Sequence, residues 1–152
     1  FESKEKMLEE VIQMMIDKEA ENAEAIASSD MPVPMKVVGI ISAFRPAENE
    51  QPIGELLERP ENLLMHSKMQ KKLMEKIIPL LTAIVEEGVK DGTFKANHIP
   101  VRLKVLLIVG SALFDDDKHT AAETEVFIDL IEKLLGAEEG TMEFIKSLIK
   151  DR

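Results

Sequence analysis

The three histidines are the side chains best suited to acid–base or ligand chemistry near neutral pH. His66 falls in a long helical pattern, on the same side as Met69 and Leu73. It fits a polar group in an otherwise apolar ligand pocket. It equally fits a half-buried histidine that is bonded to a neighbouring backbone group. His98 precedes Pro100 and is predicted to be a residue at a helix start.

His119 follows three aspartates, and this arrangement suggests a metal site. However, residues 115–125 lack the alternating acids and the central glycine of a calcium-binding loop. A solvated acidic loop is the favoured interpretation, and an enzyme that uses His119 with the neighbouring acids is the weaker alternative. A transition metal found in the purified protein would support that alternative.

No other residue pattern in the sequence indicates catalysis. Cysteine is absent, and there is no GxSxG, no HExxH and no glycine-rich phosphate loop. The paired acids Glu9–Glu10 and Glu86–Glu87 are adjacent, so on a helix they point about 100° apart. They are typical of solvated surfaces. We therefore assign no enzyme activity, no cofactor and no metal site from the sequence.

Methionine is over-represented, with nine residues, and eight of them fall in three predicted helices or beside them. The thioether is flexible and polarisable, so it suits a cavity that adapts to apolar ligands. Ordinary core filling explains any single methionine equally well. Their clustering is what suggests a pocket. The clustered residues are Met7, Met14, Met15, Met31, Met35, Met65, Met69 and Met74.

Composition and charge exclude several classes of protein. A chain of 152 residues with 45% apolar residues suits one domain with a core of its own. The net charge of −10 disfavours nucleic-acid binding by this chain, because such binding needs a basic face. The absence of cysteine fits the reducing cytoplasm. The longest apolar run, 105–114, is too short for a membrane span, which needs about 20 residues, so it predicts a buried helix.

Helix signals account for nearly the whole sequence and predict an all-α fold with about seven helices and no strands. Ser3 is expected to cap the first helix, and Thr120 with Glu123 forms a capping box. Pro79 falls inside the longest helix, and Asp91–Gly92 ends it with a left-handed cap. The predicted helices are 4–28, 35–44, 53–58, 61–91, 100–114, 120–135 and 141–149.

Apolar faces predict which helices meet. In the first helix, Leu8, Val11, Ile12 and Met15 share one side. Helices 100–114 and 120–135 are too apolar for the surface of a small monomer. We therefore expect them to bury their faces against a second copy.

Three segments together resemble the TetR family of transcriptional regulators. FESKEKMLEEVI resembles the segment after the recognition helix, through Phe1, Ser3, Lys4, Glu5 and Leu8. The segment from LERPENLL onward resembles the long central helix, with Glu87, Gly88, Gly92 and Phe94 at its end. FIDLIEKLLGAEEGT is similar to the last dimerisation helix and its tail. The resemblance spans essentially all 152 residues, and it depends on the order and spacing of the segments.

The resemblance implies a TetR-like C-terminal regulatory domain over 1–152. Residues 1–28 would connect it to an N-terminal helix-turn-helix domain that is missing from this chain, and operator DNA would be bound only through that domain. Residues 100–135 would form a four-helix bundle with a second copy, giving a homodimer. The implied protein is a cytoplasmic, ligand-responsive regulator, expected to be a repressor, whose DNA binding responds to a small hydrophobic effector.

Helical faces and the family's pocket location together give candidate residues. The ligand-binding candidates are Val11, Met14, Met15, Ile40, Phe44, His66, Met69, Gln70 and Leu73. The dimer-interface candidates are Leu103, Leu106, Leu107, Gly110, Phe127, Leu130, Ile131 and Leu134. The alternative function is an all-helical protein–protein interaction module without a small-molecule ligand, whose methionine-rich face binds a partner helix.

Overall fold

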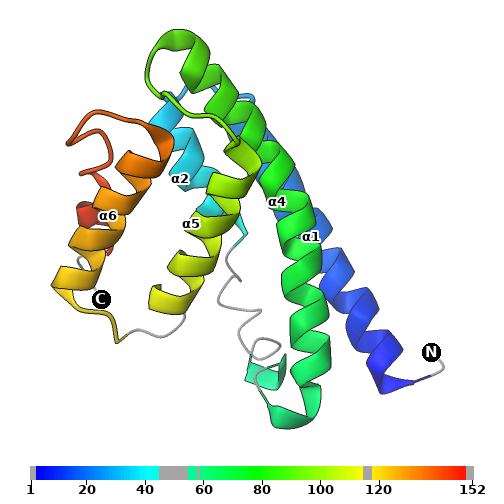
Figure 1. The fold of residues 1–152 in the computed structure, drawn as a ribbon. Coiled ribbons are helices and arrows are strands. Elements are labelled where there is room, and N and C mark those ends of the chain that lie inside the picture. Colours follow the sequence, from blue (N-terminus) through cyan, green and yellow to red (C-terminus); the bar gives the residue numbers. More distant parts are fainter. Residues whose placement is uncertain (1–2, 45–54, 58, 115–117, 150–152) are drawn as a thin grey trace. The chain divides into compact units, whose positions relative to one another are not determined.

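All regular secondary structure in the described residues is helical (Figure 1). The computed structural model describes residues 3–44, 55–57, 59–114 and 118–149. No strand occurs among these residues, which confirms the predicted all-α fold. Within the same ranges, no helix combines the length and the apolar character that a bilayer crossing requires. The helices are α1 (Lys4–Ala27), α2 (Val33–Ala43), the 3-10 turn η2 (Pro60–Asn62), α4 (Leu63–Asp91), α5 (Ile99–Phe114), α6 (Ala121–Leu135) and α7 (Ile145–Ile149).

The chain folds into two compact units. Unit 1 comprises residues 1–30 and 39–80, and unit 2 comprises residues 31–38 and 81–152. Helices α2 and α4 therefore each contribute residues to both units. All nine ligand-binding candidates belong to unit 1, and all eight dimer candidates belong to unit 2.

Helix α1 begins and ends where its local signals place it. The Ser3 hydroxyl accepts a hydrogen bond from the backbone N–H of Lys6 at 3.1 Å, which satisfies one free donor of the first turn. At the other end, the Ser28 N–H donates to the Glu24 carbonyl at 3.0 Å. The predicted end at about residue 28 is confirmed.

Three ion pairs show which residues of α1 and α4 lie opposite each other within unit 1. Lys68 Nζ lies 3.4 Å from a Glu9 carboxylate oxygen and 4.0 Å from one of Glu5. Two turns further on, Lys76 Nζ lies 4.0 Å from Asp17. Because the contacts advance in the same direction along both helices, α1 and this part of α4 run parallel. We call this set of contacts the α1–α4 ion-pair ladder.

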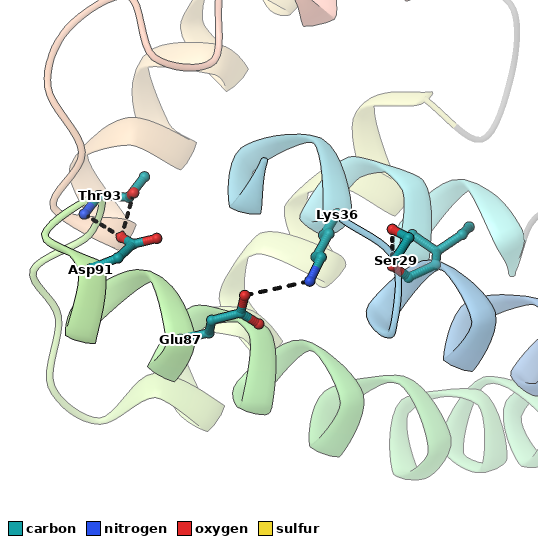
Figure 2. Close-up of polar contacts among 6 residues, drawn as sticks. Ser29, Lys36, Glu87, Asp91 and Thr93 are labelled. Atoms are coloured by element: carbon teal, nitrogen blue, oxygen red, sulfur yellow. Dashed lines mark hydrogen bonds and ion pairs between the residues drawn. The ribbon is translucent and has the colours of Figure 1, made fainter. Parts of the chain in front are cut away.

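Two glycines shape the end of α4 in unit 2. A Cβ on Gly88 would overlap the ring of Phe94, whose backbone N–H donates to the Gly88 carbonyl at 3.0 Å. Gly92 ends the helix with a φ of +88°, as predicted. The Asp91 carboxylate accepts hydrogen bonds from both the backbone and the hydroxyl of Thr93 (Figure 2).

Helix α6 is bounded by the signals that its sequence contains. Thr120 and Glu123 form the predicted capping box, with side chain-to-backbone distances of 3.1 and 3.2 Å. Gly136 ends the helix in the left-handed conformation, and a Cβ there would overlap the Lys95 carbonyl oxygen. Arg102 donates to the carbonyl of Leu134 at 2.9 Å, which ties α5 to this helix end. Helix α6 packs against α5 on one side and contacts α7.

Two predicted helices differ from the structure or fall partly outside the described residues. The prediction of a helix over 141–149 is wrong for its first part, because only Ile145–Ile149 is α-helical and turns precede it. The buried Glu132 carboxylate accepts the Met142 N–H at 2.8 Å and holds that turn in place. For the predicted helix 53–58, residues 55–57 are helical, and residues 53, 54 and 58 lie outside the described ranges.

Candidate functional site

The ligand-binding candidates on α2 belong to the core. Ile40 is 0% exposed and Phe44 is 6% exposed. Ile40 lies in the part of α2 that belongs to unit 1, and Phe44 directly follows the end of that helix in the same unit. Their depth makes them suitable as the apolar floor of a ligand site.

The candidates on α4 form one face that contains a polar pair. His66 Nε2 and Gln70 Nε2 lie 3.4 Å apart, one turn from each other on the helix. Which imidazole nitrogen carries the proton decides whether His66 accepts from Gln70. Both side chains are half-buried, as are Met69 and Leu73 on the same face. The partner of His66 is thus a side-chain amide, where the alternative interpretation expected a backbone group.

The candidates on α1 are the least buried of the set. Val11 and Met15 are half-buried, and Met14 is 71% exposed. The buried face of α1 instead contains Ile12 and Ile16, both 3% exposed. Ile12 is buried, as the predicted apolar face of α1 requires. Met14 is exposed, although it was predicted to bind a ligand.

Other buried apolar residues of unit 1 were absent from the predicted ligand set. Met65 is 5% exposed, Leu57 is 2% exposed and Ile16 is 3% exposed. The i, i+4 spacing of Ile12 and Ile16 is a signal that identifies this face. Leu57 belongs to a short segment whose burial has no periodic signal, because a period needs several turns to show.

The other two histidines have different surroundings. His98 adopts a positive φ of 49°, and its carbonyl accepts from the N–H groups of Val101 and Arg102, both at 3.1 Å. The predicted position at a helix start is confirmed. The His119 ring packs edge-on against Phe114, with centroids 4.9 Å apart.

The metal hypothesis for His119 gains no second ligand from the described residues. Its Nδ1 is buried, and no hydrogen-bond partner for it occurs in this part of the protein. The three aspartates 115–117, on which the hypothesis depends, lie outside the described ranges. Among the residues that are described, no group of three histidine or acidic side chains is placed to hold a metal ion.

The dimer candidates lie mainly between α5 and α6 of one chain. Leu103 is 0% exposed, Leu106 is 3% exposed and Ile131 is 6% exposed, so a second copy has almost nothing left to bury there. The Phe127 ring packs on Gly110, where an added Cβ would lie 3.0 Å from it, and lies 5.2 Å from the Phe114 ring. The remaining candidates, Leu107, Leu130 and Leu134, are half-buried. Whether these candidates also contact a second copy stays a prediction.

A different set of apolar residues in unit 2 is exposed. Val101, Val105 and Ile108 are 62%, 40% and 53% exposed, and their i, i+4, i+7 spacing places them on one face of α5. Val126 of α6 is 66% exposed. We call these four residues the α5–α6 apolar surface. The predicted dimer candidates do not include Val101, Val105 and Ile108, because α5 is apolar nearly all round and its pattern favours no single face.

Comparisons with known proteins add no further constraint. No protein-family model, no curated protein and no solved structure matches this chain. The functional assignment therefore depends on the residues and contacts described above.

Proposed function

We propose that this chain is the effector-sensing and dimerisation domain of a ligand-responsive transcriptional regulator of the TetR type, acting as a repressor. Unit 1 binds a small hydrophobic effector, and unit 2 pairs with a second copy. Operator DNA is bound by a separate helix-turn-helix domain, to which α1 of unit 1 is the connection. This chain itself, with a net charge of −10, has no role in binding DNA.

The observation that carries the proposal is the polar pair in an apolar setting. His66 and Gln70 are half-buried and lie 3.4 Å apart in the unit that also holds the buried Ile40 and Phe44. A few polar groups among apolar side chains are typical of small-molecule sites, where they orient the ligand. The half-buried Met69 adds an adaptable apolar contact on the same helix face.

The mechanism is a shift between two positions of α1. An effector that binds one position more tightly shifts the population towards it, and about 1.4 kcal/mol of differential binding changes the ratio tenfold. Burying about two extra methylene groups supplies that difference, at about 0.8 kcal/mol each. A displaced α1 changes the separation of the two DNA-binding domains in the homodimer.

Thermal unfolding with a panel of lipophilic and polar compounds tests the proposal. A lipophilic ligand at a hundred times its Kd adds about 2.7 kcal/mol, which raises Tm by about 5 °C or more. His66→Leu should reduce that shift because it removes the polar group of the site. Ser67→Leu is the matched control, since Ser67 is exposed one residue further along α4. A Tm that rises only with strongly polar metabolites contradicts the proposal.

The second candidate function is a helical protein–protein interaction module. The observation that favours it is the exposure of large apolar side chains in unit 1, namely Met14 at 71%, Leu63 at 67% and Leu64 at 66%. Exposed apolar residues of this kind suit a partner helix. A stable complex with an amphipathic helical peptide, without any response to lipophilic compounds, would favour this function over the sensor.

A further inference from the structure

Two helices pass from one compact unit into the other, and each does so next to a residue that weakens a helix. Helix α4 leaves unit 1 after Leu80, one residue beyond Pro79. Helix α2 enters unit 1 at Gly39.

Pro79 weakens α4 at this point because it has no backbone N–H. The Glu75 carbonyl, four residues earlier, therefore lacks its helix partner, and an interior proline costs about 3 kcal/mol relative to alanine. The other prolines of the described helices lie at helix starts, where they cost little: Pro34 and Pro100 are each the second residue of their helix. Pro79 alone interrupts a helix interior in the described part of the chain.

Gly39 weakens α2 through its backbone freedom. A glycine in a helix interior costs about 1 kcal/mol relative to alanine. It is the seventh of the 11 residues of α2, away from both ends, so no capping role accounts for it. Gly39 is half-buried.

Each side of these weak points is internally braced. Within unit 2, Lys36 of α2 lies 3.4 Å from Glu87 of α4, and the Lys36 side chain is only 6% exposed (Figure 2). This pair ties together the unit 2 portions of the same two helices. Within unit 1, the α1–α4 ion-pair ladder braces α4 up to Lys76. Between Lys76 and Glu87, no ion pair of α4 occurs among the described residues, and Pro79 lies in this interval.

We propose that Pro79 and Gly39 form a paired hinge, at which α4 and α2 bend together. The bending is a property of the chain alone and does not depend on the proposed effector or on a second copy. We expect α4 and α2 to populate more than one bend angle in solution. A ligand that binds either unit could then shift the equilibrium between these bend angles.

Spin-label distance measurements test the hinge, and the absence of native cysteine makes labelling specific. The test pair is Glu10→Cys with Glu86→Cys, and the control pair is Glu10→Cys with Glu75→Cys. All three sites are exposed. Glu75 and Glu86 lie on the same side of α4, about three turns apart, one before Pro79 and one after it. Dilution with unlabelled protein removes distances between copies.

The hinge predicts a broader distance distribution for the test pair than for the control pair. Pro79→Ala, which restores a backbone hydrogen bond, should narrow the test distribution towards the control width, and adding Gly39→Ala should narrow it further. Both substitutions raise helix propensity, and the circular dichroism spectrum and the Tm of each variant show that it is folded before its distances are compared. If the distance distribution of the test pair is as narrow as that of the control pair, the proposal is overturned. It is also overturned if the test pair gives the same width in the double variant as in the parent protein.

Discussion

At Gly88, close packing leaves no room for a side chain. A Cβ there would overlap the Phe94 ring and lie 3.0 Å from Val33 Cγ1. We predict that Gly88→Ala lowers the free energy of unfolding by about 1–3 kcal/mol, as overpacking does, measured by urea denaturation. Gly92→Ala is the comparison, because Gly92 has nothing within 4 Å and only its φ of +88° opposes a side chain. Equal stability of Gly88→Ala and the parent protein would contradict this packing.

Asp91 makes a pH-dependent contribution at the end of α4. Hydrogen bonds from the Thr93 hydroxyl and then from its backbone N–H lower the Asp91 pKa below its ordinary value of 3.8. A lowered pKa in the folded state means that the stabilisation is complete above pH 3.8 and is lost as the pH falls through the folded-state pKa. The stability difference between the parent and Asp91→Asn should therefore shrink below pH 3.8.

The carboxyl carbon chemical shift of Asp91, followed by NMR through an acid titration, measures this pKa directly. Thr93→Val removes the hydroxyl donor and keeps the backbone donor, so the Asp91 pKa should rise part of the way towards its ordinary value. An Asp91 pKa that does not change in Thr93→Val would show that the hydroxyl is not a partner in solution.

At the scale of the element, the α1–α4 ion-pair ladder predicts a salt-dependent effect. Lys68→Glu would place a third carboxylate beside Glu5 and Glu9, and we expect a loss of about 1 kcal/mol at low ionic strength. The loss should shrink in 0.5 M salt because exposed charges are screened, as thermal or urea unfolding at the two salt concentrations will show. Lys72→Glu is the matched control, since Lys72 has no ion pair within 4.0 Å among the described residues. An equal loss in both variants would show that net charge alone is responsible.

Helix ends could be predicted from the sequence because their signals are local. Ser3, the Thr120–Glu123 box and Gly136 each act through hydrogen bonds or backbone angles within a few residues. The start of α7 could not be predicted in this way, because the turn before it depends on the hydrogen bond from Met142 N–H to the Glu132 carboxylate, ten residues away. A contact of that kind is tertiary, and no local pattern encodes it.

Helix faces were predictable only where one face is apolar. On α4, the half-buried His66, Met69, Gln70 and Leu73 do share one side, as their spacing predicts. On α1, an apolar residue occurs on several sides, so Met14 was assigned to a pocket although it is 71% exposed. In α1, the i, i+4 spacing of Ile12 and Ile16 therefore indicates the buried face better than the number of methionines does.

At the scale of the whole molecule, the α5–α6 apolar surface decides how the proposed homodimer forms. The predicted candidates Leu103 and Leu106 already contact their own chain, at 0% and 3% exposure, and so hold unit 2 together. Val101, Val105 and Ile108 retain the surface that a partner can bury. A twofold interface buries the same patch on both copies, so each substitution acts twice.

We predict that Val105→Lys weakens the proposed homodimer strongly. Val105 is 40% exposed, so losing its burial in the interface costs about 0.7 kcal/mol in each copy, or about 1.4 kcal/mol in the dimer, and raises the dimer Kd roughly tenfold by sedimentation equilibrium. Val89→Lys is the control, because Val89 is 39% exposed against 40% for Val105 but lies on α4. Its Kd should stay at the parent value. If the parent protein sediments as a monomer at every concentration, the α5–α6 apolar surface has another partner, and the pairing of two DNA-binding domains by this chain loses its basis.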